Sequence, residues 1–116
     1  MTIEEFRELC LSLPGTTEDL PFDESTLAFK VMGKIFAITD IDNFEYVNLK
    51  CDPETALELR DRYEAIKAGY HMNKKHWNSV YFSSDANDSS IKEWTMESYR
   101  LVKEKLPAGI RKQLEE

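Results

Sequence analysis

The sequence predicts an α+β domain of the order α-β(3)-α-β(2)-α, with helices packed on a five-stranded antiparallel sheet. Three observations indicate this fold class. Apolar residues recur at helical spacing near both ends of the chain. Short strand-like runs separated by turn residues fill the middle, and Asp52-Pro53 interrupts them with the start of a helix. The 116 residues suffice for one hydrophobic core, so residues 1–116 are expected to form a single domain.

The first helix is predicted at the N-terminus of the chain. Thr2 and Glu5 have the spacing of a capping box, and Pro14-Gly15 ends the segment. The apolar residues between them fall on one helical face: Ile3, Phe6, Leu9, Cys10 and Leu13. The next residues, 16–25, are acidic and polar, so we expect a loop or an irregular edge segment there.

Three strands are expected next. They cover residues 26–32, 34–39 and 45–51, with a tight turn at Gly33-Lys34 between the first two. Turn-forming residues separate the second strand from the third. In the third strand, one set of side chains alternates with an apolar set: Tyr46, Asn48 and Lys50 against Val47, Leu49 and Cys51.

A helix and two further strands are predicted after the third strand. Asp52 is a good N-cap residue, and Pro53 is favoured at the first helical position. Strands are expected over residues 66–73 and 78–82. The tip between these two strands has the sequence Lys74-Lys75-His76-Trp77.

The last main helix is predicted to begin at a second capping box formed by Ser90 and Glu93. Its inner stripe is expected to be Ile91, Trp94, Ser98, Leu101 and Val102. Pro107 interrupts this helix and begins a short final helix that ends near Leu114.

The charge of the chain is acidic overall and unevenly distributed. Lys and Arg total 15 and Asp and Glu total 22, so the formal net charge is −7, which argues against a protein that coats nucleic acid by charge alone. Residues 1–25 carry seven acids and one base, and residues 52–64 carry five acids and two bases. Residues 65–84 contain three lysines and no acid, so a basic contact surface is expected there.

The acid-free window contains the most unusual local sequence of the chain. Two lysines, two histidines and a tryptophan meet at a predicted turn, where lysines can contact phosphates while an aromatic ring stacks on a base. The candidate contact residues are His71, Asn73, Lys74, Lys75, His76 and Trp77. The same residues also have a structural interpretation, in which Trp77 anchors the hairpin, the lysines keep a turn soluble and the histidines bond the backbone.

No catalytic or metal-binding pattern is recognisable in the sequence. His71 and His76 are five residues apart, which on a strand puts them on opposite faces, and no Cys or carboxylate lies near them. Phosphate-binding loops and nucleophile elbows are also missing from the sequence. We therefore expect a protein that is not an enzyme, with no cofactor and no metal.

The sequence also indicates a compartment. It contains neither a signal-peptide pattern nor a membrane-spanning apolar run, so no membrane contact is expected. Cys10 and Cys51 are too few for a disulfide scaffold and resemble small buried hydrophobic residues. A cytoplasmic location is the expectation.

Several segments together carry a resemblance that spans essentially the whole chain. They are Leu13-Pro14-Gly15, Pro21-Phe22, the strands around Phe29-Lys30-Val31 and Lys34-Ile35-Phe36-Ala37, the run from Val47 to Pro53, Ser98-Tyr99, Lys105-Leu106-Pro107 and, most specific, Tyr70 to Asn78. With these segments the chain resembles the MmcQ/YjbR family of small bacterial proteins. The resemblance implies the α-β(3)-α-β(2)-α fold, which is similar to that of secretion chaperones and loosely to frataxin-like domains.

The same resemblance implies DNA binding. The implied contact region is Asn73, Lys74, Lys75, His76 and Trp77, with Lys30, Lys34 and Lys50 as weaker candidates on the sheet. The net charge departs from this function, so any DNA contact requires a local patch that faces away from residues 1–25.

Two other functions are compatible with the sequence. One is a protein-interaction or adaptor module, which the secretion-chaperone likeness and the acidic surface of residues 16–24 favour. The other is a small-ligand-binding domain in which His71, Asn73, His76 and Trp77 line a cleft. DNA binding through the basic-aromatic hairpin is the preferred hypothesis. The expected partner is therefore DNA, or another protein if the adaptor hypothesis holds.

Overall fold

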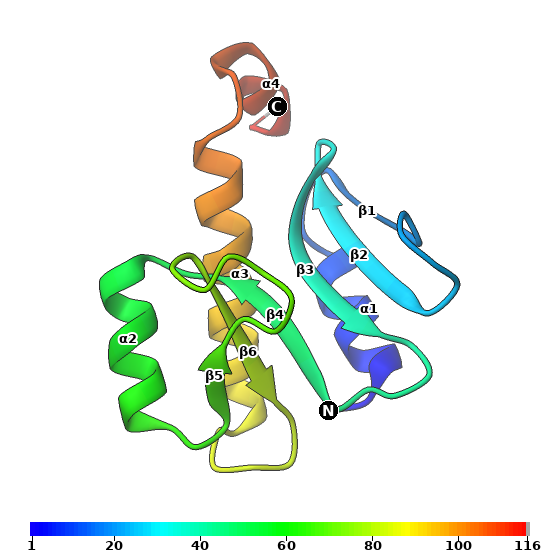
Figure 1. Ribbon diagram of the computed structural model, residues 1–116. Helices are drawn as coiled ribbons and strands as arrows, with labels where there is room; N and C mark the ends of the chain where they lie inside the picture. The colour runs from blue at the N-terminus through cyan, green and yellow to red at the C-terminus, as the bar shows by residue number, and fades with distance from the viewer. Residues whose placement is uncertain (116) are drawn as a thin grey trace.

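The computed structural model describes residues 1–115, which form four helices and one six-stranded sheet (Figure 1). The elements in chain order are α1 (Ile3–Leu11), β1 (Thr16–Asp19), β2 (Thr26–Val31), β3 (Lys34–Asp40), β4 (Tyr46–Lys50), α2 (Pro53–Arg62), β5 (Ile66–Ala68), β6 (Trp77–Tyr81), α3 (Asp88–Glu104) and α4 (Ala108–Leu114). In this range, no helix is both long and apolar enough to cross a bilayer.

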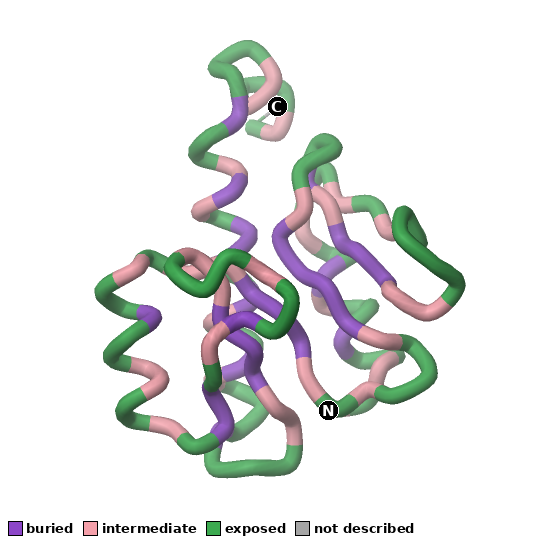
Figure 2. The backbone as a smooth tube through the Cα atoms, in the orientation of Figure 1, coloured by how far each residue is buried: buried purple, intermediate pink, exposed green. Residues whose placement is uncertain are grey.

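The sheet is antiparallel throughout, in the order β1-β2-β3-β4-β6-β5, which confirms the α+β fold class. Its helix-bearing face packs under α1, α2 and α3 and contains the core, which runs along the central strands (Figure 2). Phe6 of α1 lies at one end of this core, where its ring contacts Phe29, Phe44 and Phe82. The loop of residues 69–76 passes over the opposite face.

The sheet has six strands rather than the five that the sequence predicts. Thr16–Asp19, expected to be a loop or irregular edge segment, pairs with β2 as an edge strand. Edge strands tolerate charge because one side of their ladder meets water. Glu18 bonds Arg7 of α1, and Asp19 pairs with Lys30 of β2, so polar contacts hold this strand in place. The segment therefore lacks the apolar alternation by which a strand is recognised in a sequence.

The predicted strand over residues 66–73 is only partly correct, because β5 ends at Ala68. Gly69 lies against the start of β6, where a Cβ atom would stand 2.8 Å from the Cβ of Trp77. His71 then adopts a left-handed conformation with φ of 59°. The chain therefore leaves the sheet plane and turns back over the open face instead of continuing as a strand.

The helix ends follow local hydrogen bonds, with one correction. The predicted capping box of Thr2 and Glu5 is present, Asp52 caps α2 through Thr55, and α4 begins after Pro107. The capping box predicted at Ser90 and Glu93 is wrong, because Asn87 accepts the backbone N–H of Ser90 at 2.8 Å. In the predicted box the Glu93 side chain would have accepted the Ser90 N–H. Asn87 accepts it instead as the N-cap residue, so α3 begins at Asp88.

The ladder between β3 and β4 ends early, and a serine from α3 replaces its next rung. The pairing of β2 with β3 contains a bulge at Phe36, which brings both Phe36 and Ala37 into the core. The last β3–β4 pair is Ala37 with Leu49. Beyond it, the buried Ser98 hydroxyl donates to the Phe36 carbonyl at 2.6 Å and accepts the Lys50 N–H at 2.8 Å.

We expect Ser98→Ala to destabilise the fold more than most serine-to-alanine substitutions do. It leaves the Phe36 carbonyl and the Lys50 N–H without a partner, and each such buried group costs about 1–3 kcal/mol. Chemical denaturation would measure the loss in unfolding free energy. The matched control is Ser89→Ala on the exposed face of α3, which should change stability by less than about 0.5 kcal/mol. Equal effects of the two substitutions would contradict a bridging role for Ser98.

Asp85 fastens the loop after β6 to the segment that enters β5. Its carboxylate accepts the backbone N–H groups of Glu64 at 2.9 Å and Ala65 at 2.8 Å. These bonds lower the pKa of Asp85 below its usual value of 3.8 because they favour the ionised form. A carboxylate with a lowered pKa in the folded state stabilises the fold above its unfolded pKa.

The stability that Asp85 provides should therefore disappear as the pH falls below about 4 toward its lowered pKa. We expect Asp85→Asn to be less stable than the wild type at neutral pH and the difference to shrink in acid. Urea denaturation of both proteins between pH 7 and pH 2.5 checks this. A gap that stays constant across the range would contradict the ionic contribution.

Candidate functional site

The open face of the sheet contains a groove of about 420 Å³ beneath the loop 69–76. Strands β2, β3, β4 and β6 supply its floor, and two loops supply its rims. Its lining residues are Phe22, Thr26, Ile35, Ile38, Tyr46, Asn48, Tyr70, His71, Met72 and Trp77. The volume and the mainly apolar and aromatic lining are typical of a ligand site.

Aromatic rings dominate this groove. Tyr46 makes an edge contact with Tyr70 at 6.2 Å between ring centroids, and Tyr70 lies 4.0 Å from the ring of His71. Tyr70 and Phe22 are 54% and 64% exposed, so both rings are accessible to a ligand. Burial raises the pKa of Tyr46, which therefore stays a neutral phenol. Flat, uncharged and accessible rings of this kind suit stacking on another flat ring.

A closed ring of hydrogen bonds holds Tyr70 over the sheet. The Tyr70 N–H donates to Ser79 Oγ at 2.9 Å, the Ser79 hydroxyl donates to Asn48 Oδ1, and Asn48 Nδ2 donates to the Tyr70 carbonyl at 3.0 Å. Asn48 and Ser79 are buried neighbours on β4 and β6. The three partners satisfy one another, so the loop keeps a fixed position above the groove floor.

A second loop brings Phe22 to the groove. The Asp23 carboxylate accepts the backbone N–H groups of Ser25 at 2.9 Å and Thr26 at 2.7 Å, together with the Thr26 hydroxyl at 3.0 Å. These bonds lower the pKa of Asp23, which therefore holds the turn as a carboxylate at neutral pH. The acidic segment thus has a structural role beside the groove.

Arg60 of α2 organises the turn that precedes β6, a role that the sequence analysis missed. Its Nε donates to Asn78 Oδ1 at 2.7 Å, and its Nη2 bonds the carbonyls of Lys74 and Trp77. Nothing in the local sequence distinguishes this arginine from Arg62 on the same helix, because its partners lie 14 to 18 residues away.

The structure separates the residues of the predicted basic-aromatic hairpin. His71 and Trp77 line the groove on the open face. Lys74 and Lys75 line a different depression of about 170 Å³ against α2, together with Pro53, Glu54, Leu57 and Arg60. These two lysines and the tryptophan therefore line different depressions.

The other tip residues shape the turn. Lys74 Nζ donates to the Gly69 carbonyl at 2.9 Å, and Asn73 Oδ1 accepts the Lys75 N–H at 2.9 Å. The His76 carbonyl accepts the N–H of Cys51 at 2.8 Å, which connects the turn to the end of β4. His71 and His76 do not lie on one strand, because both precede β6 in the loop.

The three sheet lysines have different environments. Lys30 pairs with Asp19 at 3.1 Å across β1 and β2. Lys34 and Lys50 line a third depression with Lys105 from the end of α3. Lys34 and Lys50 are therefore brought together, and Lys30 is engaged by an acid.

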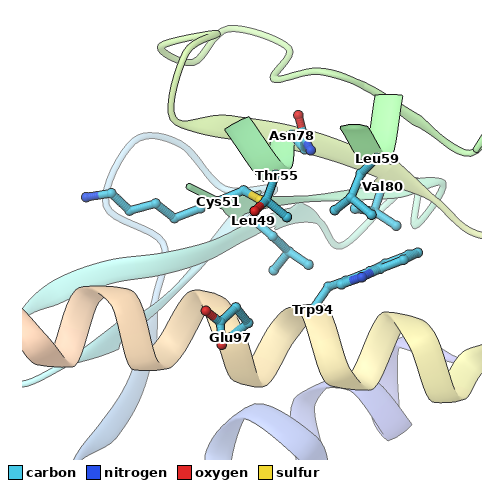
Figure 3. A pocket seen from close by; sticks show the side chains of 9 residues that line it. Leu49, Cys51, Thr55, Leu59, Asn78, Val80, Trp94 and Glu97 are labelled. Atoms are coloured by element: carbon cyan, nitrogen blue, oxygen red, sulfur yellow. The ribbon is translucent and has the colours of Figure 1, made fainter. Parts of the chain in front are cut away.

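The cavity between α2, α3 and the sheet does not provide a second site. Leu59, Trp94 and Val80 surround it, and its volume is about 40 Å³, close to that of a single water molecule (Figure 3). Burial raises the pKa of the adjoining Cys51 thiol to about 11, so it is not a nucleophilic thiolate at neutral pH. Within residues 1–115, no group of three or more His, Cys, Asp or Glu side chains could hold a metal ion.

Comparison with known proteins places the chain in a family. The YjbR family model matches residues 11–101. The chain is 37% identical over 100 residues to the uncharacterized protein YbdF of Escherichia coli O157:H7, covering 85% of this chain and 82% of that protein. It is 33% identical over 115 residues to the uncharacterized protein YjbR of Escherichia coli K12, covering 98% of each.

A solved structure agrees with this assignment. The crystal structure of the Deinococcus radiodurans protein DR2400, with a domain of the DUF419 family, superposes with a TM-score of 0.90 at 38% identity. The match covers 97% of this chain and 87% of that one. Sequence and structure thus agree over nearly the whole length, and the chain belongs to the YjbR family.

Proposed function

We propose that the protein binds single-stranded nucleic acid on the open face of its sheet, with a base stacked in the groove between Tyr70 and Trp77. The observation that carries this proposal is the accessible aromatic lining of that groove. Stacking on aromatic side chains is the usual way in which proteins hold unpaired bases. The proposed contact surface differs from the hairpin tip that the sequence favours, because Lys74 and Lys75 line a separate depression beside α2 and not the groove.

The groove supports stacking without sequence readout. Asn48 is the amide on the groove floor, and both ends of its side chain are engaged by Ser79 and the Tyr70 carbonyl. The Asn48 amide is therefore not free to read a base, and most of the remaining lining consists of rings and aliphatic side chains. Every base has a stacking face, so this arrangement favours binding that tolerates many sequences.

The charge distribution favours a single strand over a duplex. A duplex presents closely spaced phosphates that require a broad basic surface, whereas the chain has a net charge of −7 and acidic residues near the Phe22 rim of the groove. An unpaired base can enter a groove of about 420 Å³ while few phosphates touch the protein. Binding through one or two bases therefore suits this surface.

The proposal also covers activity and location: the protein binds its ligand without catalysing a reaction, and it does so in the cytoplasm. Both cysteines are free thiols, Cys10 being buried and Cys51 half-buried, and unpaired cysteines are typical of reducing compartments. They support a cytoplasmic location for this binding protein.

We expect Tyr70→Ala to weaken binding of a labelled single-stranded oligonucleotide by roughly 5- to 150-fold, because one base–aromatic stack is worth about 1–3 kcal/mol. Tyr70 is more than half exposed, so its removal should leave the fold intact. Fluorescence anisotropy at low salt gives the affinity, and the same sequence as a duplex should bind more weakly. The emission of Trp77, isolated by a Trp94→Phe substitution, should be quenched on binding.

The control for this substitution is Met96→Ala, which removes an exposed apolar side chain of α3 outside the groove. It should leave the affinity unchanged. Absence of single-strand binding at low salt would overturn the proposal. Full binding by Tyr70→Ala together with lost binding by a Lys74→Ala/Lys75→Ala variant would move the contact to the turn.

Ser79→Ala tests the position of the loop rather than its contacts with a ligand. The substitution breaks the hydrogen-bonded ring, so the Tyr70 amide should exchange with solvent faster and oligonucleotide binding should weaken although no groove side chain is removed. Amide hydrogen exchange of residues 69–72 measures the first effect. Exchange as slow as in the wild type would contradict the ring as the support of the loop.

A further inference from the structure

Three lysines surround a depression of about 200 Å³ next to the groove. Lys34 begins β3, Lys50 ends β4 and Lys105 is the C-cap residue of α3, so three separate elements converge there. Ile35 and Val102 complete the lining. Lys34 and Lys105 are exposed and Lys50 is half-buried, so the ammonium groups are available to an anion from solvent.

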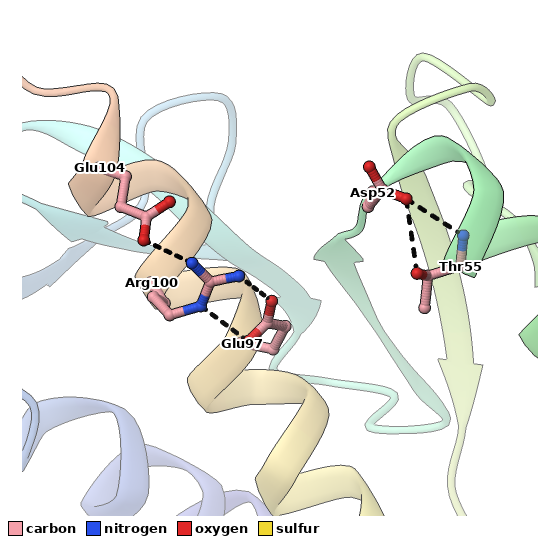
Figure 4. Close-up of polar contacts among 5 residues, drawn as sticks. All are labelled: Asp52, Thr55, Glu97, Arg100 and Glu104. Atoms are coloured by element: carbon pink, nitrogen blue, oxygen red, sulfur yellow. Dashed lines mark hydrogen bonds and ion pairs between the residues drawn. The ribbon is translucent and has the colours of Figure 1, made fainter.

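No carboxylate among residues 1–115 forms an ion pair with these lysines. The closest acids in sequence to Lys105, Glu97 and Glu104 of α3, both bind the guanidinium of Arg100 (Figure 4). Burial, and then the charge of Lys105, lower the pKa of Lys50. The cluster is therefore a local positive charge that lacks a counter-ion from the protein itself.

The depression and the aromatic groove are neighbours on β3. Ile35 lines both of them, so the two share a wall on β3. Beyond the last β3–β4 pair, Ser98 bridges the two strands near the ends that carry Lys34 and Lys50. A ligand that extends past Ile35 would leave the rings on one side and meet the lysines on the other.

We propose that Lys34, Lys50 and Lys105 form a phosphate subsite that holds the backbone phosphate next to the base stacked in the groove. This inference rests on the proposed function for its physiological ligand. Ammonium groups act as point charges that can approach from different directions, which suits a tetrahedral phosphate with several acceptor oxygens. A planar carboxylate pairs better with the two-pronged guanidinium of an arginine.

Inorganic pyrophosphate tests the subsite without a base. Isothermal titration calorimetry should detect its binding to the wild type and at least 10-fold weaker binding to Lys34→Gln/Lys105→Gln. Both residues are exposed, so this variant should fold, and a thermal melt verifies it. The matched control is Lys92→Gln/Lys112→Gln, which removes two exposed lysines from outside the depression and should bind pyrophosphate within 2-fold of the wild type.

The salt dependence of oligonucleotide binding gives a second readout. The slope of log affinity against log salt should fall by about 0.7 for each phosphate contact that the double variant loses, while Trp77 quenching at saturation persists. Binding of the oligonucleotide without any pyrophosphate binding, with an unchanged slope in the variant, would overturn the subsite and leave the stacking groove. Pyrophosphate binding that depends on these lysines, without oligonucleotide binding, would support the anion site and overturn the proposed function.

Discussion

The hydroxyl of Ser98 connects the two halves of the sheet where their own hydrogen bonding stops. The bulge at Phe36 places two consecutive side chains in the core, which adds a large ring to the packing under α3 but breaks the register with β4. A buried carbonyl and a buried N–H would then lack partners, at a cost comparable to a large part of a small domain's stability. By bonding both, Ser98 fixes the position of α3 on the sheet and links β3 to β4 beyond their last pair. The seating of α3 and the place where Lys50 meets the lysine-lined depression both depend on this contact.

Features with local causes could be predicted from the sequence. The caps at Thr2 and Asp52 follow from hydrogen bonds within three residues, and the alternation in β4 correctly places Tyr46 and Asn48 opposite the apolar face. Edge strand β1 was missed because its stabilising partners, Arg7 and Lys30, are distant in sequence. Which of the predicted site residues line the groove could not be predicted for a related reason, because Arg60 holds the turn before β6 through partners 14 to 18 residues away.

The net charge of the chain is a poor guide to the charge at any one place on its surface. Many acids have a structural partner: Asp23 and Asp85 hold backbone N–H groups, and Glu97 and Glu104 hold Arg100. Net charge therefore describes the chain poorly at the scale of one groove, because solvent ions screen interactions between exposed charges beyond about 8–10 Å.

An open sheet that displays aromatic side chains on one face is at risk of polymerising through its edges. Unpaired backbone groups along an edge strand are a template for another copy of the chain, and an apolar face would strengthen the joint. Here one edge is β1, whose four residues are all polar and include two acids paired with Arg7 and Lys30, and the other edge is β5, only three residues long. The polarity that makes β1 hard to recognise in the sequence therefore also makes this edge a poor template for another copy of the chain.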